Sequence, residues 1–276
     1  GIAVRFRYIP PGRFLMGSPE SEAGRYDWEG PQHEVTWTQG YWLADAPCTQ
    51  AVWERVMGEN PSHFVSANRP VEQVSWDDSQ EFLKRVNERT PGLMARLPSE
   101  AEWEHACRAG TQMATWLGNL EIRGERNAPL LDEMAWYGGN SGQDYELEDG
   151  VDSTDWPSKQ YPHTKAGTHE VRKKQANPNG LHDMLGNVWE WCVDMYQEHD
   201  AQAVTNPAPS AVGTGRVRRG GSWYVLARHV RASEQTGLSP DRRSDCLGFR
   251  LARGQGGWEA GTRSGPVGRG ESSNET

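Results

Sequence analysis

The sequence predicts an α+β protein in which regular secondary structure is sparse. Short strand-like segments precede segments with helical spacing, and from about residue 110 to 180 Gly, Asn, Asp and Pro dominate without a regular period. The 276 residues allow one large domain or two small ones. Thirteen Trp against five Phe favour a core in which indole N–H groups make hydrogen bonds.

The N-terminal part of the chain contains four candidate strands. Residues 4–9 alternate in character and end at a Pro-Pro-Gly turn, which is typical of a strand followed by a reversal. Three further short segments are strand candidates, at 14–18, 33–37 and 41–43.

Three helices are expected after these strands. Thr49 can cap a helix that runs to about Met57 along an apolar stripe, and Asp77–Asp78 open a second helix. Ser99 and Glu102 have the spacing of a capping box, in which each side chain accepts the other residue's backbone N–H.

Charge and cysteine usage exclude some classes of function. A net charge of −9 argues against a general nucleic-acid binder. The sequence contains no run of about 20 apolar residues, so insertion into a membrane is not expected. The chain shows no leader segment, although it begins at Gly1. Scattered cysteines favour free thiols in a reducing compartment such as the cytoplasm; export to the surface by a signal outside this chain stays open. The cysteines are Cys48, Cys107, Cys192 and Cys246.

Six sequence blocks stand out for their motifs: Phe14–Ser18, Pro70–Trp76, Arg96–Glu104, Gly180–Trp191, Arg219–Trp223 and Gly248–Arg250. Together they resemble the formylglycine-generating-enzyme (sulfatase-modifying factor) domain family. The resemblance covers about residues 3 to 253 and implies an elaborated C-type-lectin fold of the formylglycine-generating-enzyme type. It therefore implies one domain over 1–253, and the Gly- and Ser-rich residues 254–276 are expected to be a disordered tail.

The resemblance also implies a structural calcium site at the turn before the Trp-Glu-Trp block. Its expected ligands are the carboxylates of Asp183 and Glu190 and the carbonyls of Gly186 and Val188. A hard cation prefers several oxygen ligands, which these groups supply. The alternative is that both carboxylates bond backbone N–H groups in a turn without metal.

Copper chemistry is not expected, because the chain lacks the cysteine pair that active family members use. Those enzymes bind copper(I) through two cysteines five residues apart, just after the Gly-Gly-Ser block. Val225 and Val230 stand at the matching positions, so we predict no catalytic residue and no copper. Substitution by Cys107 or Cys192 is a less favoured alternative.

The segment 220–250 is similar to the variable region of proteins diversified by diversity-generating retroelements. In those proteins, randomised adenine-rich codons give many residue types but never Lys, Glu, Gln, Met or Trp. The open positions of this chain all hold permitted residues within a frame of constant character, and we predict that they bind ligand. They are Tyr224, Val225, Leu226, His229, Leu238, Arg242, Ser244 and Cys246.

The sequence thus favours a non-catalytic ligand-binding protein that displays a diversified surface on a C-type-lectin scaffold. Its partner is expected to be a protein or cell-surface ligand of unknown identity. Arg219, Arg243 and Arg250, together with Trp223, are expected to pin the supporting loops. The alternative is a formylglycine-generating-type oxidase or related protein-modifying enzyme, and an accessory domain of a kinase or secretion system also stays open.

Overall fold

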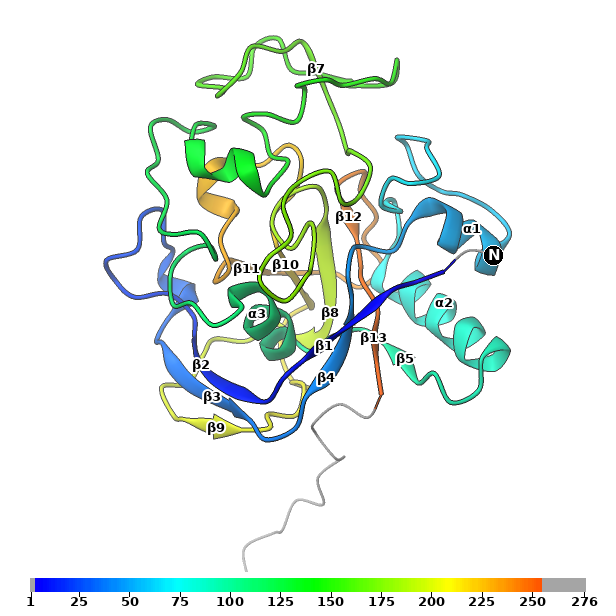
Figure 1. Cartoon of the computed structure of the whole chain (residues 1–276), viewed down its shortest axis with the longest axis vertical. Coiled ribbons are helices and arrows are strands. Elements are labelled where there is room, and N and C mark those ends of the chain that lie inside the picture. Colours follow the sequence, from blue (N-terminus) through cyan, green and yellow to red (C-terminus); the bar gives the residue numbers. More distant parts are fainter. Residues whose placement is uncertain (1–2, 255–276) are drawn as a thin grey trace, which may run out of the picture.

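The fold consists of small sheets and three helices joined by long irregular segments (Figure 1). The computed structural model describes residues 3–254, so residues 255–276 of the expected tail lie outside the described part of the chain. Within 3–254, no helix has the length and apolarity that crossing a bilayer requires. The predicted α+β class is confirmed.

The first sheet joins the two ends of the described chain in the strand order β1-β4-β13-β5. All its pairings are antiparallel, and β13 inserts between β4 and β5. The predicted strands at 4–9 and 41–43 are confirmed, and the structure pairs them as neighbours in this sheet. The bounds are β1 Phe6–Ile9, β4 Tyr41–Ala44, β5 Ala95–Arg96 and β13 Ala252–Arg253.

The second sheet carries the C-terminal third of the chain in the order β11-β10-β8-β12. β10 pairs antiparallel with β8 and β11, and β12 joins β8 in parallel. The sequence did not predict these strands, since β8 is almost wholly buried and β10 is mostly arginine, so neither shows the expected alternation. They span β8 Trp189–Met195, β10 Arg216–Arg219, β11 Gln235–Leu238 and β12 Leu247–Gly248.

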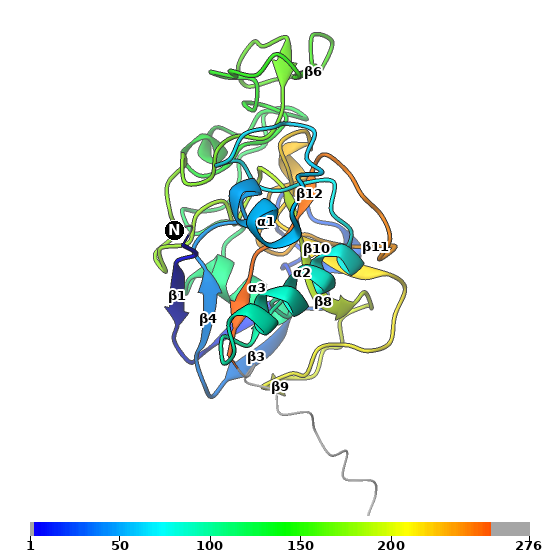
Figure 2. The same cartoon turned by 90° about the vertical axis from the view of Figure 1, so that its right-hand side faces the viewer.

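Two smaller sheets complete the strands. β2, β3 and β9 form one of them, and the β6–β7 pair lies at the opposite end of the molecule (Figures 1 and 2). Between 110 and 180 the only regular elements are this pair and one 3₁₀ turn, which confirms the irregular middle. The bounds are β2 Gly12–Met16, β3 His33–Trp37, β6 Val151–Asp152, β7 Lys165–Ala166 and β9 Val204–Thr205.

The three α-helices begin close to the predicted residues. Ser99 Oγ accepts the N–H of Glu102 at 3.1 Å and its own N–H donates to that carboxylate at 2.8 Å, so the capping box is confirmed. The second helix begins one residue earlier than predicted, because Ser75 caps it in the same reciprocal way with Asp78. The helices are α1 Gln50–Met57, α2 Trp76–Arg89 and α3 Glu100–Arg108; 3₁₀ turns are η1 Asp27–Glu29, η2 Pro129–Glu133 and η3 Ala227–His229.

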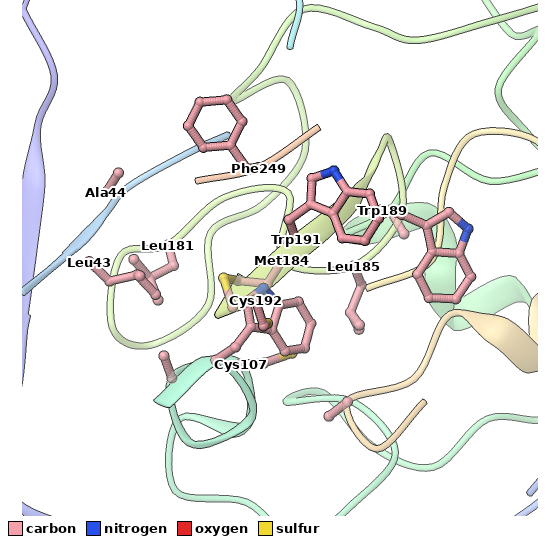
Figure 3. Packing of buried hydrophobic residues seen from close by; sticks show 14 of the residues in the cluster. Leu43, Ala44, Cys107, Leu181, Met184, Leu185, Trp189, Trp191, Cys192 and Phe249 are labelled. Carbon is pink, nitrogen blue, oxygen red and sulfur yellow. The ribbon is translucent and has the colours of Figure 1, made fainter. Parts of the chain in front are cut away.

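One continuous core joins the second sheet to α3 and the first sheet. Figure 3 shows Trp191 and Cys192 of β8 in the same cluster as Cys107 of α3 and Phe249, which follows β12. The indole N–H of Trp191 donates to the Val74 carbonyl at 3.1 Å, so the expected hydrogen-bonded indoles are present in part. Other indole N–H groups are buried without a partner among the described residues: those of Trp37, Trp53, Trp116, Trp136 and Trp189. All four cysteines are buried and free, which confirms the prediction of buried free thiols.

Candidate functional site

The predicted open segment, residues 220–250, starts at two positions that only glycine can occupy. Gly220 and Gly221 both have positive φ. A Cβ at Gly220 would lie 2.8 Å from the Met184 carbonyl oxygen, and one at Gly221 would lie 2.8 Å from that of His229. The turn therefore packs backbone against backbone and fixes where the following residues emerge.

Arg219 holds the start of this segment from inside the protein. Its guanidinium is fully buried and donates to Glu100 at 2.8 Å and Glu104 at 2.9 Å, both on α3. It also donates to the Ala232 carbonyl at 3.1 Å, so one side chain joins β10, α3 and the loop before β11. The prediction that Arg219 pins the supporting loops is confirmed.

Arg250 holds the other end of the segment in the same way. Its guanidinium meets the Glu190 carboxylate in a forked pair at 2.6 and 2.7 Å and also donates to the carbonyls of Ala44 and Asp183. Such bidentate pairs fix orientation as well as distance. Both ends of the segment are therefore anchored on buried carboxylates.

Trp223 and Arg243 also take their predicted supporting places. The indole N–H of Trp223 donates to the Asp245 carbonyl at 3.0 Å, which ties the start of the segment to its end. Its ring packs edge-on against Phe64 at 5.2 Å. Arg243 makes two 2.7 Å hydrogen bonds to Asp78 on α2, at the protein surface.

The structure presents part of the predicted ligand-binding set to solvent. Tyr224 is 39% exposed, and Arg242 is also exposed. The half-buried members are Leu226, His229, Leu238 and Ser244.

For two members of the set, the prediction of a solvent-facing side chain is wrong. Val225 is 7% exposed, and its carbonyl accepts the Gly138 N–H at 3.0 Å, which turns its side chain into the core. Cys246 is 2% exposed, because its carbonyl pairs with Trp189 of β8 just before β12 begins. Their neighbours in sequence, Tyr224 and Ser244, lie further out.

The exposed surface of the open segment continues onto the loop that carries Tyr26 and Trp28. The sequence analysis did not predict that this distant loop takes part. The His229 ring stacks on Tyr26 at 5.5 Å, and Tyr26 stacks on Trp28 at 4.2 Å. Trp28 is 41% exposed, and Arg228 lies over the Tyr26 ring at 3.8 Å. The only available sequence signal was an aromatic pair within a polar loop. We call Tyr26, Trp28, Tyr224, Leu226, His229, Leu238, Arg242 and Ser244 the binding face.

A concave pocket lies beside Leu226 at the edge of the binding face. Its volume is about 700 Å³, and its wall includes Leu226 and Ile122 as well as the acidic residues Glu20, Asp27 and Glu125. The face thus combines aromatic and aliphatic area with charges of both signs, a composition suited to protein recognition.

Glu72 lies buried beneath the segment. Its Oε1 accepts the Phe64 N–H at 2.8 Å, while its Oε2 makes no hydrogen bond to the described residues. Burial raises the pKa of Glu72 to about 8. The hydrogen bond from the Phe64 N–H lowers this pKa, and the negative charge of Asp245 raises it. The Glu72 side chain is therefore mostly neutral at pH 7.

Replacing Glu72 by Gln is expected to remove a pH dependence of stability. Between pH 4.5 and 8 the folded protein keeps a proton that the unfolded chain has released, so the wild-type free energy of unfolding falls as pH rises. We expect Glu72→Gln to exceed wild type by about 2 kcal/mol or more at pH 8 and to match it within about 1 kcal/mol at pH 5. Urea unfolding at both pH values measures this, and equal differences at the two would contradict the shifted pKa.

Comparison with known proteins decides the family. A family model described as the sulfatase-modifying factor enzyme 1-like domain matches residues 5–255. The chain belongs to this family. It is 30% identical over 230 residues to the formylglycine-generating enzyme of Mus musculus, covering 80% of this chain and 53% of that enzyme. It thus spans about half the length of the mouse enzyme.

Two solved structures share the fold. Treponema denticola variable protein 1 superposes with a TM-score of 0.69 at 28% identity, covering 90% of this chain and 94% of that one. PvdO from Pseudomonas aeruginosa superposes with a TM-score of 0.67 at 23% identity, covering 90% and 93%. The elaborated C-type-lectin fold of the formylglycine-generating-enzyme type is therefore confirmed.

The two valines at the positions where the resemblance implies copper-binding cysteines lie inside the protein. Val230 is fully buried and Val225 nearly so, and neither side chain can bind a metal. The alternative thiols are also buried: burial raises the pKa of Cys107 to about 12 and that of Cys192 well above its ordinary value. Both therefore stay protonated at neutral pH.

The turn implied to hold calcium has its carboxylate oxygens already bonded. Arg250 and the Trp103 indole N–H contact Glu190, and the Arg172 N–H donates to Asp183 at 2.8 Å. Gly186 and Val188 lie in the same buried turn, but Arg250 supplies the positive charge. In this arrangement the four groups do not fit an open oxygen cage, and calcium stays a prediction.

Proposed function

We propose that this chain is a non-catalytic ligand-binding protein whose binding face contacts a protein or cell-surface ligand. One observation carries the proposal. Tyr224 is exposed between the buried Trp223 and Val225, on a backbone whose ends are anchored by the buried Arg219 and Arg250. A rigid frame that displays a large aromatic side chain loses little entropy when it binds.

The similarity to a variable protein extends the proposal. Treponema denticola variable protein 1 matches nearly the whole fold at 28% identity. We propose that this chain, like the variable proteins of diversity-generating retroelements, varies at its open positions. The mechanism is recognition by surface shape and chemistry, in which no covalent bond changes.

Stability measurements should separate displayed from structural positions within this segment. Tyr224→Ser with Arg242→Ser is expected to change the free energy of unfolding by at most about 1 kcal/mol, because Arg242 is exposed and the partly exposed Tyr224 ring meets the core only at the edge of Trp223. Val225→Ser, the matched control one residue away, is expected to cost about 2 kcal/mol, because it buries a hydroxyl and leaves a void. Comparable losses in both variants, measured by urea unfolding, would make Tyr224 a structural residue.

Natural variants of the locus test the function itself. Differences should cluster at the open positions, and a reverse-transcriptase gene with an adenine-bearing near-copy of the last coding segment should lie nearby. Variants scattered evenly over the chain, with neither genetic element present, would contradict the proposal.

The second candidate is a formylglycine-generating-type oxidase or a related protein-modifying enzyme. The 30% identity to the mouse formylglycine-generating enzyme favours it, and the buried Val225 and Val230 oppose it. Incubation with copper(I) and a Cys-x-Pro-x-Arg peptide, followed by mass spectrometry, distinguishes the two. Formation of an aldehyde would favour the enzyme, and recovery of unmodified peptide the binding protein.

A further inference from the structure

A second hollow lies away from the binding face, where α1 and α2 meet β1 and β13. Its volume is about 580 Å³, within the range of small-molecule sites. Phe82 and Leu251 are buried in its floor, and the other apolar residues of its lining are half-buried. We call it the α1–α2 groove. Its apolar lining is Val4, Phe6, Val52, Val56, Phe82, Val86, Leu93 and Leu251.

The charged residues that line this groove all have the same sign. Arg55, Arg89 and Arg253 line it, and no Asp or Glu does, although the whole chain carries a net charge of −9. Among the described residues none of the three arginines forms an ion pair with a carboxylate. Arg89 donates to the Arg55 carbonyl at 2.9 Å, and Arg253 lies over the Phe6 and Trp42 rings. Three positive charges that pair with no carboxylate of residues 3–254 lie beside apolar walls, an arrangement complementary to an amphipathic anion.

We propose that the α1–α2 groove binds a single long-chain alkyl carboxylate, such as a free fatty acid. The alkyl chain would lie along the apolar walls and the carboxylate would meet the arginine rim, where a guanidinium can bond both of its oxygens. Each buried CH₂ group of the ligand adds favourable transfer free energy. The apolar walls need no polar group on the ligand besides its carboxylate.

The lining favours an alkyl chain over a bound peptide. Thr90 is the one uncharged polar residue in it, so the groove wall supplies few hydrogen-bond partners. A peptide brings a backbone N–H and C=O at each residue, and buried groups of this kind require partners. None of the lining residues belongs to the binding face, so the inference stands or falls independently of the proposed function.

Isothermal titration of the full chain with dodecanoate, kept below its micelle concentration, tests the inference. We expect saturable binding of one dodecanoate per chain and no comparable binding of dodecyltrimethylammonium, which has the same chain length and the opposite charge. The Arg55→Gln, Arg89→Gln double variant should raise the Kd at least about tenfold, the change expected when a charge-assisted contact is lost.

Two further variants keep the test specific to the groove. Val86→Asp puts a carboxylate into the wall and should abolish binding, while Arg13→Gln, on the exposed surface of β2, should leave the Kd unchanged. Circular dichroism checks that each variant is folded.

Several results would overturn the proposal. Failure of the full chain to bind dodecanoate, equal binding of the ammonium probe, or an unchanged Kd in the double arginine variant would each do so. Sedimentation that shows a dimer which Val86→Asp dissociates would assign the groove to a second copy of this chain instead.

Discussion

Replacing Arg219 by Met is expected to lower the free energy of unfolding by about 3–5 kcal/mol. The change keeps most of the side-chain volume but leaves Glu100 and Glu104 buried without their shared cation. It also removes the donor to the Ala232 carbonyl. Since a domain of this kind is stable by only about 5–15 kcal/mol, the loss takes a large share of its stability. Urea unfolding at pH 7 measures it.

The pH dependence of this variant identifies the cause. In the wild type, burial opposes the charge on Glu100, but Arg219 and His199 lower the pKa of its carboxyl below the ordinary value. The contribution of ionised Glu100 to the free energy of unfolding is therefore present above about pH 4.5 and is lost as the pH falls through the lowered pKa. Without Arg219, burial raises the pKa of Glu100 instead, so the deficit of the variant should be largest near pH 7 and shrink towards pH 5.

A second substitution separates lost pairing from lost packing. Arg219→Met combined with Glu100→Gln removes the uncompensated charge, so the double variant should be more stable than the single variant at pH 7. Equal stability of the two would show that packing, not the stranded carboxylate, causes the loss. Arg242→Met is the matched control, because this exposed arginine of the same segment should change stability by less than about 0.5 kcal/mol.

The N-terminal elements were predictable because their signals are local. The Ser99–Glu102 capping box and the strand candidate at 33–37 each lie within a few residues, and the structure reproduces both. The second sheet could not be predicted in this way. Arg219 on β10 is a charged residue that is buried with the carboxylates of Glu100 and Glu104 as partners. Because these partners lie more than a hundred residues earlier, no local sequence pattern predicts its burial.

The site was predictable only in part for the same reason. Resemblance to a family gave the frame of glycines, Trp223 and arginines, and the structure confirms their supporting contacts. It did not show which open positions point outward. Val225 turns inward because its carbonyl pairs with the Gly138 N–H, and Cys246 turns inward because its carbonyl pairs with the Trp189 N–H of β8. Nor could it reveal Tyr26 and Trp28, which reach the face through the stacking of His229 on Tyr26.

Replacing Arg231 by Met is expected to release the loop that carries Tyr26 and Trp28. The buried guanidinium bonds Glu22 at 2.6 Å and Glu29 at 2.7 Å, and Ser233 donates to the same two carboxylates at 3.0 and 2.9 Å. Without the arginine, the carboxylates of Glu22 and Glu29 remain buried and lose the cation that they share. We expect a loss of about 3–5 kcal/mol.

Tryptic cleavage after Arg25 in native buffer reports this release, because protease cuts a loop that has opened. Cleavage should be much faster in Arg231→Met than in wild type and unchanged in the control Arg242→Met. Equal rates in Arg231→Met and wild type would mean that the loop is held by other contacts.

Acid should affect the wild type and the Arg231→Met variant in opposite ways. Burial alone would raise the pKa of Glu29, but the hydrogen bond and charge of Arg231 lower it to about 2. Wild-type stability from this pair is therefore present above pH 4.5 and lost between pH 4.5 and 2. In the variant the uncompensated carboxyl favours the neutral form, so lowering the pH from 7 to 5 should slow cleavage after Arg25 relative to a short peptide substrate. The same pair would then explain why the aromatic part of the binding face stays in place at neutral pH: its loop is anchored on a charge network that ends in the open segment itself.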